Sequence, residues 1–215
     1  MVEQLGDSVS FYKLGLEIFM AGGYFELIDW LGERGKKSFV DLKFFDVPQT
    51  VGSAVRQLRG KNVQFITVHG NQLIFEEACK YKNGIKILAV TVLTSLDQSD
   101  IDDLGFSVNV DKLVFSRARR ALEAGCDGVI SSGMESRLLR DELGEKFIIV
   151  VPGIRPVENR VIDDQKRTVD VEEAFLNGAD YIVVGRPIRN ADNPMQAAED
   201  IQERIKVLFE PKSQE

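Results

Sequence analysis

Short runs of β-branched and aromatic residues alternate with longer amphipathic stretches along the whole chain. Several of the short runs are almost continuously apolar (FITV, ILAV, FIIVV and YIVV), which is typical of parallel strands that other layers cover on both faces. We therefore expect a parallel strand at each short run. The expected strands cover residues 10–14, 38–43, 64–68, 85–90, 128–131, 147–151 and 181–184.

The stretches between these runs have the apolar spacing of helices that pack on a sheet. The expected helices cover residues 22–35, 49–59, 111–124, 171–177 and 194–209. Glycine follows the last apolar position in GCDG and GAD, as is common where a helix ends. Unbroken alternation of strands and helices predicts a parallel α/β fold, and one domain over residues 1–215 is sufficient.

Composition and charge restrict the classes of function. The net charge of −7 and the pI near 5.0 argue against nucleic acid or an anionic membrane as the main partner. Cys79 and Cys126 lie in unrelated contexts without CxxC spacing, so we expect reduced thiols and no thiolate metal site. No apolar run reaches about 20 residues and no signal peptide is recognisable, which predicts a cytoplasmic protein. The single histidine, His69, leaves little basis for a histidine-rich metal site, and a structural role is the more ordinary expectation.

The segment DLKFFDVPQT carries the most informative charges. Asp41 and Lys43 are two positions apart at the end of an apolar strand, so they are expected to point to the same side. Barrel enzymes place their chemistry at this end of their strands. Asp46 follows in the loop before a helix that starts near Pro48. The segment alone leaves two interpretations open, a catalytic group and a structural ion pair between Asp41 and Lys43.

Lys13 is a further charge in an otherwise apolar strand, within SFYKLGLE. A lysine whose ammonium reaches solvent from a strand end would explain it equally well on its own. With Asp41 and Lys43 on the neighbouring strand, however, alternating lysine and aspartate side chains would satisfy each charge.

Two strand-end loops predict a phosphate site. VVPGIRP contains Pro152 and Arg155, and IVVGRPI contains Gly185 and Arg186. Loops after the last two strands of α/β barrels often bind phosphate, and arginine donates paired hydrogen bonds to it. Either arginine alone could be an ordinary solvent-facing residue.

Two further segments could belong to a ligand-binding site, but each also has an ordinary structural explanation. The polar stretch within residues 152–169 contains DDQKR, which could close over a ligand or be a surface loop. Thr94, in TVLTS, could present a hydroxyl at the barrel mouth or belong to a common turn.

Together these segments resemble orotidine 5′-monophosphate decarboxylases of the bacterial type. The motifs that carry the resemblance occur in the family's order over nearly the whole chain. They are FYKLGLE, VDLKFFDVPQTV, ITVHG, LAVTVLTS, PGIRP, DDQKR and VVGRPI. The resemblance implies a (β/α)8 TIM barrel that decarboxylates orotidine 5′-monophosphate as a homodimer, without metal or organic cofactor.

The resemblance also implies roles for individual residues. Lys43 would donate a proton to C6 of the pyrimidine, Asp41 would face the substrate carboxylate, and Lys13 would bind ribose and order the charges. Asp46 and Thr50 would enter the active site of the neighbouring subunit. The remaining implied contacts are to the pyrimidine from Thr94, to the substrate from Pro152, and to the phosphate from Arg155, Gln165, Gly185 and Arg186.

One departure from the family is substantial. A (β/α)8 barrel has eight strands, whereas the chain begins with what reads as the end of a helix that leads into a strand. The family's first strand, with an ALD-type motif, has no counterpart here, and roughly 20 residues are missing by the usual size of a strand and helix. Two alternatives stay open. One is a Mg²⁺-dependent sugar-phosphate lyase of the same superfamily, which shares the DxKxxD motif; the other is a truncated nucleotide-binding barrel without activity.

Overall fold

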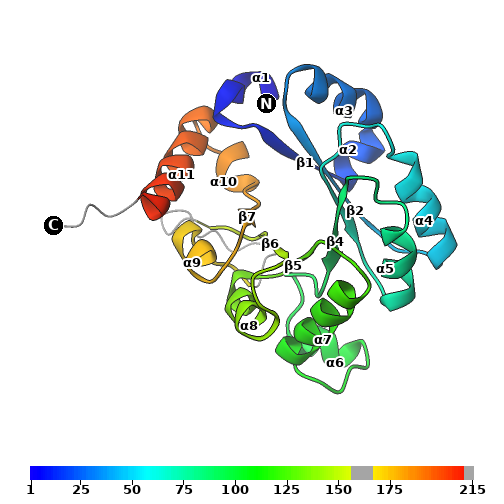
Figure 1. Cartoon of the computed structure of the whole chain (residues 1–215). Helices are drawn as coiled ribbons and strands as arrows, with labels where there is room; N and C mark the ends of the chain where they lie inside the picture. Colours follow the sequence, from blue (N-terminus) through cyan, green and yellow to red (C-terminus); the bar gives the residue numbers. More distant parts are fainter. Residues whose placement is uncertain (156–166, 211–215) are drawn as a thin grey trace.

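The computed structural model describes residues 1–155 and 167–210. Its strands are β1 (Phe11–Gly15), β2 (Lys37–Phe44), β3 (Phe65–Val68), β4 (Lys86–Val90), β5 (Gly128–Ile130), β6 (Ile148–Val151) and β7 (Tyr181–Ile182). They form one parallel sheet in chain order, and Figure 1 shows the sheet curled with helices around its outside. This arrangement confirms the predicted parallel α/β barrel class, and each predicted strand overlaps an observed one.

The helices follow the strands around the sheet (Figure 1). They are α1 (Val2–Leu5), the 3₁₀ helix η1 (Gly6–Ser8), α2 (Leu16–Ala21), α3 (Tyr24–Glu33), α4 (Pro48–Gln57), α5 (Gln72–Cys79), α6 (Gln98–Asp103), α7 (Val110–Glu123), α8 (Gly133–Leu143), α9 (Val171–Leu176), α10 (Arg186–Arg189) and α11 (Pro194–Phe209). The five predicted helices correspond to α3, α4, α7, α9 and α11, and the other helices of the described residues were not predicted.

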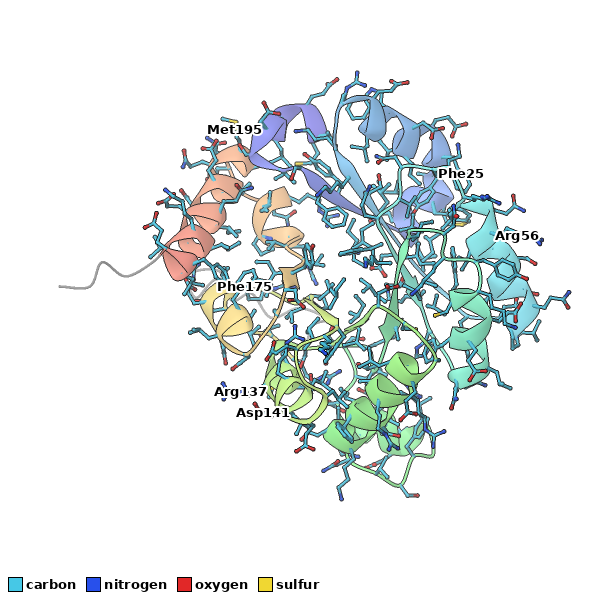
Figure 2. The ribbon with its side chains drawn as sticks, viewed as in Figure 1. Phe25, Arg56, Arg137, Asp141, Phe175 and Met195 are labelled. Atoms are coloured by element: carbon cyan, nitrogen blue, oxygen red, sulfur yellow. The ribbon has the colours of Figure 1, made fainter. Side chains whose placement is uncertain are left out.

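Helix α8 was not predicted, because its buried face is unusually polar. A capping box between Ser132 and Glu135 starts the helix. Glu135, Ser136 and Arg140 are buried beside Leu139, so the apolar spacing that marks other helices is interrupted. By contrast, the outer face carries ordinary exposed charges, among them the ion pair of Arg137 and Asp141 in Figure 2.

The core has two layers. Apolar side chains between helices and sheet include Ile28, Val55 and Phe75, all almost inaccessible to solvent. A smaller cluster inside the curled sheet contains Phe39, Phe65, Leu88 and Val150. These two layers fix the strand ends from which the polar side chains below project.

The sheet does not close in the described part of the chain. β1 and β7 lie at its two edges, and no backbone pairing between them is present in residues 1–155 and 167–210. A largely apolar groove of about 1100 Å³ lies between these edges. Aromatic rings nevertheless meet across the interior, since Phe11 of β1 and Tyr181 of β7 lie 6.2 Å apart and both contact Phe65. Within the same described residues, no helix has both the length and the apolar character needed to cross a membrane.

Candidate active site

A pocket of about 300 Å³ opens where the carboxyl ends of the strands meet. Its polar lining comes from Lys13, Asp41, Lys43, Thr94 and Ser95. Phe39, Ile130, Pro152 and Val183 supply apolar walls. The structure therefore brings together five of the predicted site residues, which are Lys13, Asp41, Lys43, Thr94 and Pro152.

Asp41 is the centre of the polar array. Its carboxylate accepts hydrogen bonds from Lys13 Nζ at 2.7 Å, from Lys43 Nζ at 3.0 Å and from Thr67 Oγ1 at 2.9 Å. The Asp41 side chain is only 12% exposed. Burial alone would raise the pKa of the Asp41 carboxyl, but the Lys13 and Lys43 ammonium groups outweigh that effect and hold the pKa below its usual value. Asp41 is therefore an anion with a cation on each side.

The backbone of Lys43 departs from regular strand geometry. The register between β2 and β3 is irregular between Val40 and Phe44, and Lys43 has a φ of 49°. This left-handed conformation is unfavourable for a side chain with a Cβ, so the surroundings must stabilise it. The Lys43 N–H donates to Thr67 Oγ1 at 2.9 Å. Strand periodicity correctly predicted that Asp41 and Lys43 meet, but it did not predict this distortion.

Thr67 is a site residue that sequence reasoning missed. It lies in the apolar run of β3, is 1% exposed, and bonds both Asp41 and the Lys43 backbone. The sequence could have indicated this role, because Thr67 is a hydroxyl residue in an apolar strand that follows the charged strand. A buried hydroxyl needs a polar partner.

Asp46 and Thr50 lie outside this pocket. Both are exposed, and Asp46 Oδ1 accepts a hydrogen bond from the Val47 N–H at 2.6 Å. The neighbouring Phe45 and Val47 are 67% and 63% exposed. Asp46 thus projects from an apolar part of the surface at the start of α4.

Three of the predicted phosphate residues, Arg155, Gly185 and Arg186, follow β6 and β7 and are not part of the pocket lining. Arg155 is buried. Its guanidinium Nη1 donates to the Ile154 carbonyl, and its backbone N–H donates to the Val169 carbonyl at 3.0 Å. Gly185 lines the groove between β1 and β7, and Arg186 is the first residue of α10. Gln165 lies outside the described residues, as does most of the polar stretch predicted to close over a ligand.

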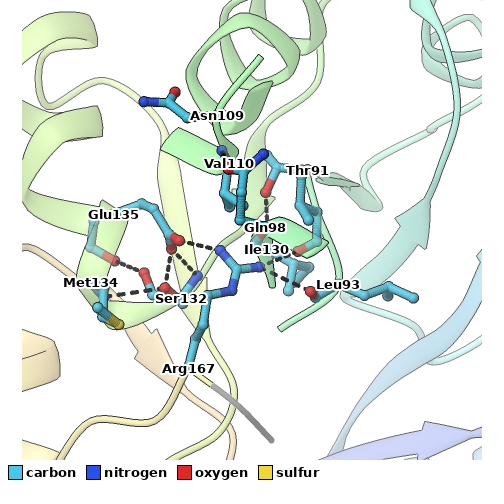
Figure 3. A network of polar contacts seen from close by, with 12 residues as sticks. Thr91, Leu93, Gln98, Asn109, Val110, Ile130, Ser132, Met134, Glu135 and Arg167 are labelled. Carbon is cyan, nitrogen blue, oxygen red and sulfur yellow. Dashed lines mark hydrogen bonds and ion pairs between the residues drawn. The ribbon is translucent and has the colours of Figure 1, made fainter. Parts of the chain in front are cut away.

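Arg167 links the chain after this stretch to the pocket wall (Figure 3). Its guanidinium forms an ion pair with Glu135, which the Ser132 hydroxyl also contacts. Arg167 Nη2 donates to the carbonyls of Val92 and Leu93 at 3.2 and 2.9 Å. Because Val92 and Leu93 are the two residues before Thr94 and also line the pocket, Arg167 holds the strand-end segment that forms this wall.

His69 has a structural environment. Its Nδ1 lies 3.2 Å from the Val90 carbonyl, and its ring packs on Phe45. Burial lowers the pKa of His69, assisted by the positive charge of Arg117 and Lys43. In residues 1–155 and 167–210, no three His, Cys, Asp or Glu side chains converge as a metal site would require.

Several known proteins are similar to this chain in sequence and in fold. Residues 1–201 match the family model described as Orotidine 5'-phosphate decarboxylase / HUMPS family. A Methylococcus capsulatus protein named orotidine 5'-phosphate decarboxylase is 62% identical over 209 residues, which cover 97% of this chain and 86% of that protein. A relative of the same name from Stenotrophomonas maltophilia is 48% identical over 206 residues, which cover 95% of this chain and 85% of that protein.

Solved structures agree with the sequence matches. The orotidine 5'-phosphate decarboxylase structure from Lactobacillus acidophilus has a TM-score of 0.78 and 32% identity, and the match covers 93% of this chain and 86% of that one. The structure from Pyrococcus horikoshii OT3 has a TM-score of 0.73 and 27% identity, with 95% and 90% covered. The similarity therefore covers most of both chains.

Proposed function

The chain belongs to the orotidine 5'-phosphate decarboxylase / HUMPS family, and from this we propose that it converts orotidine 5′-monophosphate to uridine 5′-monophosphate. This reaction is the last step of de novo pyrimidine nucleotide synthesis. One observation carries the proposal: an ionised Asp41 lies between two lysines in the pocket of a chain that is 62% identical to a decarboxylase of this name.

The chemistry requires a stabilised carbanion. When CO₂ leaves, the electron pair of the broken bond stays on C6, where the pyrimidine ring delocalises it poorly. The Lys43 ammonium, fixed 3.0 Å from Asp41, would stabilise this charge and then transfer a proton to C6. The lysine amine regains its proton from solvent. Lys43 thus supplies both the positive charge and the proton, and the reaction needs no metal.

Asp41 would act on the departing group. A substrate carboxylate placed beside the Asp41 anion is disfavoured, and this repulsion disappears as CO₂ forms. The low pKa of Asp41, which Lys13 and Lys43 maintain, keeps the repelling charge in place at neutral pH. Lys13 would also bind the ribose, and Thr94 and Pro152 would contact the pyrimidine side of the substrate.

The phosphate would bind far from the reacting carbon, and its binding free energy would help to desolvate and orient the substrate at that carbon. We assign this role to Arg155, Gln165, the Gly185 backbone and Arg186. The positions of Arg155 after β6 and Gly185–Arg186 after β7 support the assignment, because successive strand ends lie side by side in a parallel sheet.

We also propose a homodimer whose subunits share their sites. Asp46 and Thr50 lie outside the pocket of their own subunit, and exposed Phe45 and Val47 flank Asp46. Burial of these apolar side chains against a second copy would bring Asp46 to the ribose of the partner's substrate.

A decarboxylase assay in EDTA tests the proposed function. We expect orotidine 5′-monophosphate to be converted at the same rate with and without EDTA. The family description also covers HUMPS proteins, and a Mg²⁺-dependent lyase would instead turn over a sugar phosphate only when the metal is present. Strict dependence on Mg²⁺, or binding of uridine monophosphate without turnover of the substrate, would refute the proposal; the second result would identify a non-catalytic barrel.

A further inference from the structure

Cys79 and Cys126 are distant in sequence but adjacent in the fold. Cys79 is the last residue of α5, and Cys126 lies in the turn between α7 and β5. Their sulfur atoms are 3.9 Å apart, and both residues are free thiols. From this contact we propose that the two cysteines form a modification site, which a hydroperoxide oxidises to an intramolecular disulfide.

The local structure holds both segments in place. Gly125 has a φ of 94°, and this left-handed turn lets the Cys126 N–H return to the Ala121 carbonyl at 3.0 Å. Lys82, three residues after Cys79, donates to the Gly125 carbonyl and to the Asp127 carboxylate at 3.1 and 3.2 Å. The residues on both sides of Cys126 are therefore fixed to the segment that follows Cys79.

The two thiols differ in their chemistry. Cys79 is half-buried, whereas Cys126 is buried at 7% exposure. The hydrogen bond between the two thiols lowers the pKa of Cys79, and the nearby Lys82 ammonium has the same effect. The same contact and burial raise the pKa of Cys126. Cys79 is thus the accessible nucleophile and Cys126 the resolving thiol.

The reaction balances with one hydroperoxide. With hydrogen peroxide, the Cys79 thiolate attacks one peroxide oxygen; the S–O bond forms, the O–O bond breaks, and the leaving hydroxide takes up the proton released by the Cys79 thiol to become water. Cys126 then attacks the Cys79 sulfur, the S–S bond forms, the S–O bond breaks, and a second water leaves with the Cys126 proton. The sulfur atoms need to approach by only about 2 Å to reach bonding distance.

The modification site lies away from the candidate active site. Cys126 precedes the first residue of β5, whereas Asp41, Lys43 and Thr94 lie near or after the carboxyl ends of their strands. In a parallel sheet these are opposite ends of the barrel. The disulfide would connect the end of α5 to the start of β5 and close a loop between residues that are 47 positions apart. We expect it to raise the melting temperature by roughly 5–10 °C.

Intact-mass measurement after one equivalent of hydrogen peroxide tests the proposal. We expect the wild-type chain to lose about 2 Da, to lose both titratable thiols, and to recover both with a reducing agent. In Cys126→Ala, Cys79 should instead gain about 16 Da as a sulfenic acid that dimedone traps.

The matched control is Cys79→Ser, a change at the half-buried position that keeps the side-chain size. Its remaining thiol, Cys126, should react at least about tenfold more slowly than the wild type. Addition of oxygen without loss of hydrogen in the wild type would overturn the proposal, as would equal reaction rates for the wild type and Cys79→Ser.

Discussion

At the scale of single residues, the site depends on the hydrogen-bond donors that surround the buried Asp41 carboxylate. Asp41 has two lysines and the Thr67 hydroxyl within 3.0 Å, so each of its oxygens has a donor. A half-satisfied charge at this depth would be costly. Thr67 contributes twice, because it also accepts the N–H of Lys43, whose φ is positive.

Replacement of Thr67 by valine should therefore affect both stability and turnover. Thr67→Val keeps the shape and removes the hydroxyl, which should destabilise the fold by about 1–3 kcal/mol and lower kcat by roughly tenfold. Thr67→Ser keeps the hydroxyl and should retain most of the activity. Urea unfolding and steady-state kinetics measure the two effects. Equal kinetics for the valine and serine variants would contradict a role in positioning Lys43.

His69 should make stability depend on pH near neutrality. Because burial lowers the pKa of His69 in the folded state, the unfolded chain takes up the proton first as the pH falls. The stabilisation is thus present above pH about 6.5 and is lost as the pH falls through the folded pKa. In His69→Asn the amide N–H can still bond Val90 O without titrating, so the loss of unfolding free energy between pH 7 and 5 should be smaller. A loss as large as that of the wild type would show that other groups cause it.

At the scale of elements, Arg167 connects three parts of the barrel. It joins the chain that precedes Val169 to α8 through Glu135, and to the segment after β4 through the carbonyls of Val92 and Leu93. Val169 in turn pairs with Ile154 after β6. Arg167 and the Ile154–Val169 pairing therefore support the strand-end segments around the pocket.

Arg167→Ala should be strongly destabilising. It leaves Glu135, whose side chain is 3% exposed, as a buried charge without its cation, at a cost of about 3–5 kcal/mol. The control is Arg137→Ala, which breaks the exposed pair with Asp141 on the same helix and should cost less than about 1 kcal/mol. Chemical unfolding compares the two variants, and equal losses would contradict the importance of the buried pair.

The sequence predicted the structure correctly where the pattern of apolar and polar residues depends on a single strand or helix. The short β-branched and aromatic runs identified every strand in the described residues, and the spacing of Asp41 and Lys43 indicated the side chains that meet in the pocket. The sequence did not predict features that depend on contacts between residues distant in the chain. Helix α8 buries Glu135 and Arg140 because Arg167 and Asp180 neutralise them, and Cys79 meets Cys126 only in the folded chain. The positive φ of Lys43 likewise depends on Thr67 of the next strand.

At the scale of the whole molecule, the proposed dimer predicts complementation between two inactive variants. If Asp46 serves the partner's site, a mixed dimer of Lys43→Ala and Asp46→Ala contains one site with both side chains intact. An equal mixture that exchanges subunits should then recover about a quarter of the wild-type activity, since half of the dimers are mixed. No recovery, with mixed dimers verified by affinity tags, would place Asp46 in the site of its own subunit.

A comparison of Lys43→Ala with Lys37→Ala tests the catalytic role of Lys43 most directly. Both lysines lie on β2, but Lys37 is exposed at the opposite end of the strand. We expect Lys43→Ala to lose at least about 10⁴-fold in kcat, since it removes both the stabilising charge and the proton donor. It should still bind uridine monophosphate, whereas Lys37→Ala should match the wild type. Substantial turnover by Lys43→Ala would contradict the assignment of Lys43 as the group that stabilises and protonates C6.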